Sequence, residues 1–242
     1  MKRRKVSCMY KNYVFDLYGT LIDTKKNWNH EYLWEKMSQL YCFHGACYDS
    51  DEFKEKFEKY LGKIRENDAD DQHVDIDIED IFFQLFKKKN VKPKNKLVRE
   101  AARVFLLLIT ENLEIKAYVN QLIEQLKEQD KNIYIFANGQ ATFAKNELRA
   151  VGLYDAFETI VMSSNTRLKK TNDKAFESFI ENQGLKDKKT LIIGRNYQEN
   201  IDGAAHIGLD SVHIIGKDEE PLNDTKATYT IKEDEILKIL EL

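Results

Sequence analysis

The sequence predicts an α/β protein in which a doubly wound parallel sheet is interrupted, after its first strand, by an inserted all-α domain. Beyond residue 114, short apolar segments alternate with helical segments, and nearly continuous apolar strands are typical of a parallel sheet covered on both faces. Residues 24–113 show helical periodicity alone. We therefore expect residues 1–23 and 114–242 to form an α/β core and residues 24–113 to form a helical cap domain, which suits a chain of 242 residues.

The core elements follow from the spacing of apolar residues. The apolar segment at residues 10–17 predicts the first strand. After the insertion, the expected helices span residues 117–130, 141–151, 173–183 and 201–207, and the expected strands span residues 132–137, 159–162, 190–193 and 211–215. Because each strand is followed by a helix, neighbouring strands are expected to run parallel.

The inserted region is predicted to consist of helices. Apolar residues recur at helical spacing in residues 28–43, 51–64, 78–89 and 96–113, and Asp51 is a candidate N-cap for the second helix. Residues 66–80 are strongly acidic, but they lack the central glycine that a calcium-binding loop requires. We therefore expect a solvated turn between helices there.

The composition indicates a soluble globular protein. The net charge of −3 argues against binding to nucleic acid or an anionic membrane. No stretch approaches the roughly 18 apolar residues of a membrane-spanning helix, and no signal-peptide core follows the basic residues 1–5. The cysteines Cys8, Cys42 and Cys47 are odd in number and lack metal-binding spacing, so we expect reduced thiols and a cytoplasmic location. No oligomeric state is indicated.

The most informative segment is residues 13–21, Tyr-Val-Phe-Asp-Leu-Tyr-Gly-Thr-Leu. It carries one carboxylate, Asp16, from the end of a predicted strand into a glycine turn followed by the hydroxyl of Thr20, and this suits covalent catalysis. The segment resembles the first motif of the haloacid dehalogenase (HAD) superfamily, Asp-x-Asp-Gly-Thr-Leu. The resemblance implies that Asp16 is the nucleophile and that Thr20 helps to hold a phosphate, whereas Tyr18 stands where the second acid is usual.

Two later segments resemble the second and third HAD motifs. Asn138 and Gly139 match the second motif, although Ala137 replaces its hydroxyl residue, and their backbone amides are expected to face an anion. The resemblance implies that Lys170 holds the nucleophilic carboxylate and neutralises phosphate charge in the transition state. The neighbouring register at Lys169 stays open, because threonine replaces the proline that usually follows this lysine.

The fourth motif keeps its glycines but lacks its acids. Gly194 matches the end of the strand, whereas Arg195 lies in the region of the first acid and Asn200 replaces the second. Two other carboxylates, Glu199 and Asp202, lie nearby in the sequence. We do not expect either to substitute, because on an α-helix each is rotated roughly 100° or more from Asn200.

These departures affect both the metal and the proton chemistry that the resemblance implies. The implied Mg²⁺ ligands are Asp16, the backbone carbonyl of Tyr18 and Asn200. An asparagine oxygen lacks a charge, and Arg195 beside the site would repel a cation while attracting a phosphate, so Mg²⁺ is expected to bind weakly or not at all. Tyrosine, with a pKa of about 10, is also a poor substitute for a carboxylate that activates water.

We therefore expect a HAD-type hydrolase of the phosphatase type, which acts on a small phosphorylated or anionic ligand through an aspartyl-phosphate on Asp16, with weak or lost activity. One alternative is a catalytically impaired relative that binds an anionic ligand or a protein partner. Another is a metal-free site in which Arg195 supplies the positive charge. A metal-free 2-haloacid dehalogenase is less favoured, because those enzymes use an arginine early in the cap and the first one here is Arg65.

Overall fold

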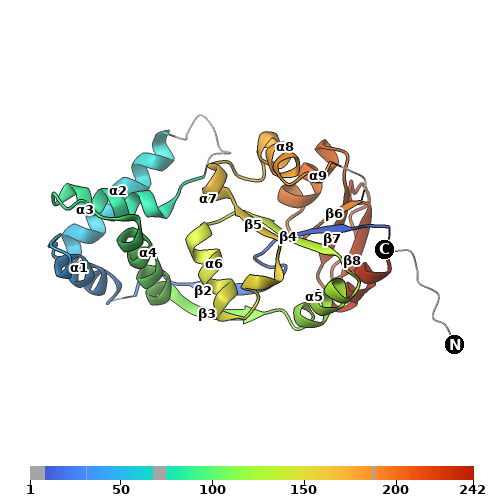
Figure 1. The fold of residues 1–242 in the computed structure, drawn as a ribbon, viewed down its shortest axis with the longest axis horizontal. Helices are drawn as coiled ribbons and strands as arrows, with labels where there is room; N and C mark the ends of the chain where they lie inside the picture. Colours follow the sequence, from blue (N-terminus) through green and yellow to red (C-terminus); the bar gives the residue numbers. More distant parts are fainter. Residues whose placement is uncertain (1–8, 31, 68–74, 187–188) are drawn as a thin grey trace.

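The computed structural model describes residues 9–30, 32–67, 75–186 and 189–242. Its core is a six-stranded sheet in the order β5-β4-β1-β6-β7-β8, in which all neighbouring strands are parallel (Figure 1). The strands are β1 (Asn12–Phe15), β4 (Asn132–Ala137), β5 (Thr159–Met162), β6 (Thr190–Gly194), β7 (Asp210–Ile215) and β8 (Tyr229–Lys232). The predicted doubly wound α/β fold is confirmed.

The strand order reverses at β1. From β1 the chain builds β4 and β5 on one side, and later β6, β7 and β8 on the other. Phe15 pairs with Ile135 of β4 and with Ile193 of β6, so the residues that follow these positions leave the same edge of the sheet. Such a reversal opens a crevice at the carboxyl ends of the strands, and ligands of doubly wound proteins bind there.

Apolar side chains cover both faces of the sheet. Tyr13 and Phe15 of β1 join one cluster with α5 (Val119–Glu128), whereas Val14 joins the opposite cluster with α8 (Asp173–Asn182). This alternation explains why the strand is apolar throughout. The other core helices are α6 (Ala141–Ala150), α7 (Ser163–Thr166), α9 (Gly203–His206), 3-10 segments at Tyr154–Ala156 and Glu233–Glu241, and a π-helical segment at Tyr197–Asp202.

The cap contains α1 (Leu33–Phe43), α2 (Ser50–Asn67), α3 (Ile78–Lys88) and α4 (Asn95–Ile109), and it lies at one end of the molecule (Figure 1). It has its own aromatic core, in which Phe105 packs against Phe57 and Phe82 with ring centres 5.2 and 5.4 Å apart. Trp28 precedes α1 and packs edge-on against Phe105 at 5.0 Å. No helix in the described residues is long and apolar enough to span a membrane.

The inserted region is not entirely helical, contrary to the prediction. β2 (Ile22–Lys26) and β3 (Thr110–Ile115) form an antiparallel pair that connects cap and core, and the expected boundaries at residues 24 and 113 fall within it. The helical prediction failed here because β2 is mostly polar and β3 continues directly from the last turn of α4. At the start of α2, Asp49 rather than Asp51 acts as the cap, since its side chain accepts from the backbone N–H of Glu52 at 2.7 Å.

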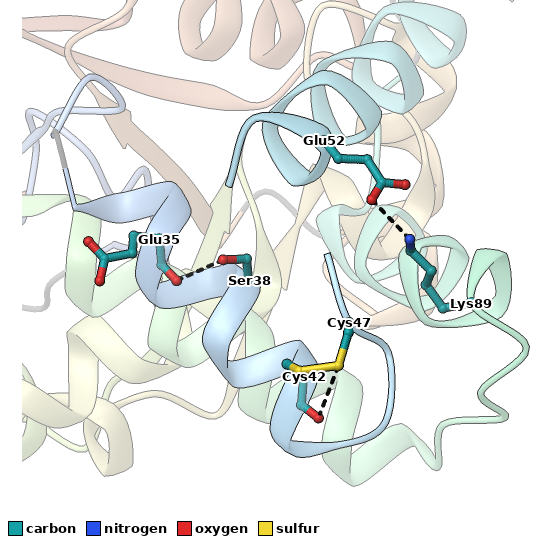
Figure 2. Close-up of a disulfide and its surroundings, with 6 residues drawn as sticks. All are labelled: Glu35, Ser38, Cys42, Cys47, Glu52 and Lys89. Atoms are coloured by element: carbon teal, nitrogen blue, oxygen red, sulfur yellow. Dashed lines mark hydrogen bonds and ion pairs between the residues drawn. A yellow bond between two sulfur atoms is a disulfide. The ribbon is translucent and has the colours of Figure 1, made fainter. Parts of the chain in front are cut away.

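A disulfide joins Cys42, near the end of α1, to Cys47 (Figure 2). Gly45 takes a left-handed conformation with φ of 82°, which turns the chain back after the helix. The prediction of reduced thiols is therefore wrong for this pair, because the count and spacing of cysteines do not show which of them meet after a helix ends. Cys8 lies outside the described residues.

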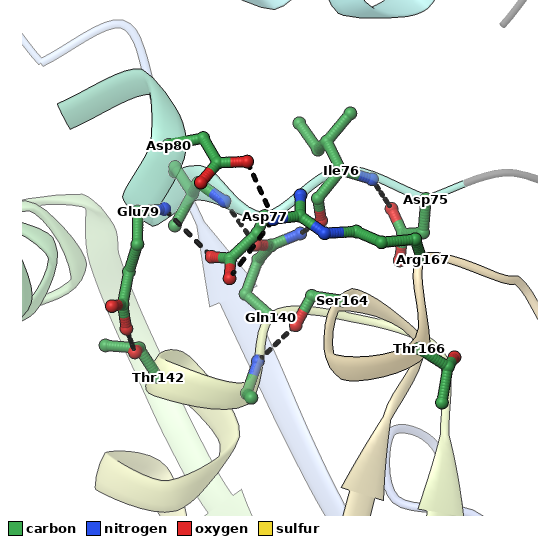
Figure 3. Close-up of polar contacts among 12 residues, drawn as sticks. Asp75, Ile76, Asp77, Glu79, Asp80, Gln140, Thr142, Ser164, Thr166 and Arg167 are labelled. Atoms are coloured by element: carbon green, nitrogen blue, oxygen red, sulfur yellow. Dashed lines mark hydrogen bonds and ion pairs between the residues drawn. The ribbon is translucent and has the colours of Figure 1, made fainter. Parts of the chain in front are cut away.

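The start of α3 is hydrogen-bonded to the loop between β4 and α6 (Figure 3). The Gln140 side chain accepts from the backbone N–H of Ile78 at 2.7 Å and donates to the carbonyl of Ile76 at 2.9 Å. Two further pairs join the start of α3 to the core: Asp80 pairs with Arg167, which follows α7, at 2.7 Å, and Glu79 accepts from Thr142 of α6. The cap is thus held beside the loop that carries Asn138 and Gly139.

Candidate active site

Asp16 lies at the carboxyl end of β1, and its backbone N–H donates to the carbonyl of Ile193 in β6 at 2.8 Å. Its side chain is buried. The chain then turns at Gly19, whose φ of 73° favours glycine. Beyond the turn, the hydroxyl of Thr20 is buried and has no hydrogen-bond partner among the described residues. A buried hydroxyl of this kind is suited to bind a ligand oxygen.

Lys170 lies shortly before α8 and is 2% exposed. Its ammonium is 3.4 Å from Asp16 Oδ1, donates to the carbonyl of Phe136 at 2.8 Å, and also donates to Asn200 Oδ1. Burial lowers the pKa of Lys170, and the Asp16 carboxylate opposes this change. Lys170, the register preferred from the sequence, therefore meets the predicted nucleophile.

Asn200 is fully buried, and its amide contacts the second oxygen of the nucleophile. Nδ2 donates to Asp16 Oδ2 at 3.3 Å and to the carbonyl of Asn196 at 2.8 Å. The amide reaches this place because Gly194 has no side chain, since a Cβ there would lie 2.4 Å from the Asn200 side chain. Asp16 is thus held by an ammonium at one oxygen and by an amide N–H at the other.

Asn138 and Gly139 follow β4 and organise the loop around the lysine. Asn138 Oδ1 accepts from the backbone N–H of Lys170 at 2.8 Å. The Gly139 N–H, which was expected to face an anion, donates to Ser163 Oγ at 2.7 Å instead. A Cβ at Gly139 would lie 3.1 Å from the ring of Tyr18, so a larger residue would crowd that ring.

Glu199 lies near enough to the site for its charge to interact with those of Asp16 and Lys170. The pKa of its half-buried carboxylate is raised by burial first and then by the negative charge of Asp16, with Lys170 and Asn138 opposing. Tyr197–Asp202 is π-helical and not the α-helix that was expected, although adjacent residues point in different directions in both kinds of helix. Nothing in the residue spacing signals this. The other nearby acid, Asp202, pairs with Lys226 at 2.8 Å.

Arg195 is not brought to the nucleophile. Its guanidinium pairs with Glu233 at 3.1 Å and with Glu219 at 3.4 Å, two carboxylates from the C-terminal part of the chain. The expectation that Arg195 faces a bound phosphate therefore finds no support in the geometry. The physical reason is that these two acids lie far along the sequence, where spacing around Gly194 cannot reveal them.

Tyr18 occupies the position of the second acid but directs its hydroxyl to α6. The hydroxyl donates to Glu147 Oε2 at 2.6 Å, and Lys26 Nζ lies 2.6 Å from Oε1 of the same buried carboxylate, an ion pair without hydrogen-bond geometry. Burial raises the pKa of Tyr18 well above its usual value, and Glu147 raises it further. The phenol therefore stays protonated at neutral pH and is unsuited to proton transfer.

Known proteins of one family resemble this chain. The sequence profile of the haloacid dehalogenase-like hydrolases matches residues 10–208. The chain belongs to this family. A glyceraldehyde 3-phosphate phosphatase from Methanopyrus kandleri is 28% identical over 148 residues, which cover 59% of this chain and 63% of that protein. The same activity is named for a Methanothermobacter thermautotrophicus protein that is 24% identical over 89 residues, covering 37% of this chain and 39% of that protein.

Solved structures share the fold of this HAD-like hydrolase. A 2-haloacid dehalogenase from Pseudomonas syringae has a TM-score of 0.63 at 17% identity, covering 96% of this chain and 97% of its own. A HAD phosphatase from Thermococcus onnurineus has a TM-score of 0.55 at 20% identity, covering 95% and 97%. Because phosphatase and dehalogenase share this architecture, the fold does not choose between the two reactions.

The residues around Asp16 do not fit a Mg²⁺ ion in the arrangement that the family implies. Asn200 turns its nitrogen to Asp16 and its oxygen to Lys170. A flipped amide would place its oxygen against the Asp16 carboxylate and the carbonyl of Asn196, and its N–H groups against an ammonium, so the orientation is set by its partners. The atom that meets Asp16 is therefore a donor, whereas Mg²⁺ requires oxygen ligands.

Proposed function

We propose that this HAD-like hydrolase is a slow phosphatase that acts on a small phosphorylated substrate through Asp16 and has little need of Mg²⁺. One observation carries the proposal: the buried Asp16 carboxylate is held between the Lys170 ammonium and the Asn200 amide. A carboxylate that is positioned by fixed donors is a suitable nucleophile, and a nearby ammonium stabilises charge on a transferring phosphoryl group. The named activity of the two sequence relatives also supports a phosphate ester as substrate.

The reaction proceeds in two steps. The Asp16 carboxylate attacks phosphorus, the bond from phosphorus to the leaving oxygen breaks, and that oxygen takes a proton from water. A second water then attacks the aspartyl-phosphate, the bond between phosphorus and Asp16 breaks, and phosphate leaves as the water gives up its proton to solvent. In this proposal the Thr20 hydroxyl, which has no hydrogen-bond partner among the described residues, donates to a phosphate oxygen.

Slow turnover is expected because Asn200 and Tyr18 stand where the family pattern has acids. Asn200 supplies a dipole where a divalent cation would offset the repulsion between a carboxylate and a phosphate. The Tyr18 hydroxyl donates its proton in a hydrogen bond to Glu147, so it does not act as a general acid or base. Loss of such a group lowers rates by about 10²–10⁴-fold. Because Tyr18 does not protonate the leaving oxygen, substrates with weakly basic leaving groups are expected to react fastest.

Phosphate release from acetyl phosphate, p-nitrophenyl phosphate and glycerol phosphate tests the proposal. We expect the first two to react and the third to react far more slowly, with and without EDTA. The Asp16→Asn variant, which keeps the shape of the side chain, should release no phosphate. Equal rates in wild type and Asp16→Asn would refute attack by Asp16.

The alternative is a relative that binds anions without turning them over, and the protonated, half-buried Tyr18 favours it. It would show calorimetric phosphate binding that depends on Lys170 but no phosphate release. Chloride release from 2-chloropropionate would instead identify a dehalogenase. Such an enzyme would need a cap arginine to bind the halide, and the side chain of Arg65 lies outside the described part of the structure. We also propose a cytoplasmic location, which the Cys42–Cys47 disulfide makes less usual.

A further inference from the structure

A polar groove of about 520 Å³ lies between α4 of the cap and α6 of the core. Its volume is within the range of small-molecule sites. Neither Asp16 nor Lys170 lines it, although Ala141 and Thr142 at the start of α6 connect its wall to the loop that follows β4. The groove is therefore separate from the candidate active site, and the inference below does not depend on the proposed reaction.

Cationic side chains form both walls of the groove. Lys96, Arg99 and Arg103 are three and four residues apart on α4, so they lie along one face of that helix. Lys145 and Arg149 are four residues apart on α6 and line the same groove. The two helices are packed together by the stacked rings of Phe105 and Phe143, whose centres are 6.4 Å apart.

Within the part of the chain that the structure describes, these charges have no carboxylate partner. Among the described residues, Lys96, Arg99, Arg103 and Lys145 form no ion pair within 4.0 Å, and Arg149 lies over the ring of Tyr154 at 3.9 Å. Two acids, Asp77 and Glu79, also line the groove, and each already has partners within the protein. Asp77 accepts from the backbone N–H of Glu79 and lies 3.9 Å from Arg167, and Glu79 accepts from the Thr142 hydroxyl (Figure 3).

Several exposed cations elsewhere in the chain are paired with carboxylates. Lys25, Lys186 and Lys238, for example, each lie within 2.9 Å of a carboxylate. Others, such as Lys88 and Lys92, form no ion pair among the described residues but lie outside the groove. What distinguishes the groove is that five cationic side chains line one cavity, in a chain whose net charge is −3. This convergence indicates a binding site for an anion rather than an ordinary solvated surface.

We propose that the α4–α6 groove binds a small ligand with two or more linked phosphate groups, which bridges the cap and the core. Arginine recognises phosphate through paired N–H groups, and the amides of Asn146 and Asn165 in the lining add neutral donors. A long polyanion is disfavoured, because beyond the groove it would meet a surface of net negative charge. An inorganic tripolyphosphate and a nucleoside triphosphate share the required chemistry.

Isothermal titration of the full-length protein with tripolyphosphate and with ATP tests the proposal. Arg99→Ser/Arg103→Ser should weaken tripolyphosphate binding about tenfold or more, because two charge-assisted contacts are lost. Lys145→Ser tests the opposite wall and should also weaken binding. The matched control is Lys88→Ser/Lys92→Ser, which removes the same charge from exposed residues outside the groove and should bind as wild type does.

Each result either supports binding in the groove or places the ligand elsewhere. Binding to tripolyphosphate alone would identify a linear polyphosphate as the ligand class, and tighter binding of ATP would indicate a nucleotide. Equal losses in the groove variant and the control would refute the proposal, as would absence of binding. A loss in Asp16→Asn would place the ligand at the active site instead, and tighter binding of a long single-stranded nucleic acid would overturn the assignment to a small ligand.

Discussion

The Asp16 site and the α4–α6 groove both use positive charge, but they present it in opposite ways. At the Asp16 site one ammonium, that of Lys170, is buried and fully engaged by protein oxygens. In the groove, five cationic side chains line a solvent-accessible space, and none of them makes an ion pair among the residues that the structure describes.

The difference indicates two different tasks. A buried charge is expensive without partners, so each of its contacts is fixed and the geometry is defined before any substrate binds. Exposed charges keep their hydration and need no partner in the folded protein, so they stay available to bind a ligand. Substitutions at the first site should therefore alter stability and chemistry together, whereas those at the second should alter binding alone.

The largest effect is expected for Lys170→Met. This change leaves the buried Asp16 carboxylate without its counter-ion, and removal of one partner of a buried pair destabilises by about 3–5 kcal/mol. Urea denaturation measures the free energy of unfolding. The exposed Lys174, four residues further on, provides the control Lys174→Met, which should change stability little. A similar small change in both variants would contradict a buried pair at Asp16.

Asn200→Asp should convert the site to one that responds to Mg²⁺. The new carboxylate faces Asp16 without an N–H to donate, so the two acids repel each other until a cation binds between them. At a Mg²⁺ concentration 100-fold above Kd, binding would stabilise the variant by about 2.7 kcal/mol. Thermal unfolding with Mg²⁺ and with EDTA measures this. If wild type gains the same stability from Mg²⁺, the Asn200 orientation does not exclude the metal.

Glu199→Gln should remove a pH dependence of stability. The pKa of Glu199 is raised in the folded protein above the ordinary value of 4.5, so folding favours its protonated form. The corresponding stabilisation is present below pH 4.5 and is lost as the pH rises through the folded pKa. Relative to the variant, wild type should therefore become less stable as the pH rises from 4.5 through the folded pKa. Parallel stability curves for the two proteins would show that Glu199 is not held near Asp16.

The smallest effect on folding is expected for Arg103→Ser. Arg103 is exposed and makes no ion pair among the described residues, so the free energy of unfolding should stay within about 0.5 kcal/mol of wild type. Its loss should appear only in the binding of tripolyphosphate, and the difference from wild type should shrink as salt screens the charges. A large loss of stability would mean that Arg103 supports the fold and is not reserved for a ligand.

Much of the core was predictable because its elements are defined by local periodicity. The strands expected at residues 132–137 and 159–162 have the observed bounds of β4 and β5. In the cap, the same reasoning missed β2 and β3, because a polar strand is recognised by its partner and not by its own pattern. Elements after residue 215 were not anticipated, and β8 and the final 3-10 segment lie there.

The candidate site divides in the same way. By itself the sequence determined that a carboxylate, Asp16, ends the first strand of an α/β core and that a lysine precedes a later helix, since these positions depend on neighbouring residues. Only the tertiary structure decided that the amide of Asn200 turns its nitrogen to Asp16, that Arg195 is neutralised by distant acids, and that α4 and α6 place their cations on one groove. The physical reason is that hydrogen bonds and ion pairs select partners by distance in space, which a one-dimensional pattern does not contain.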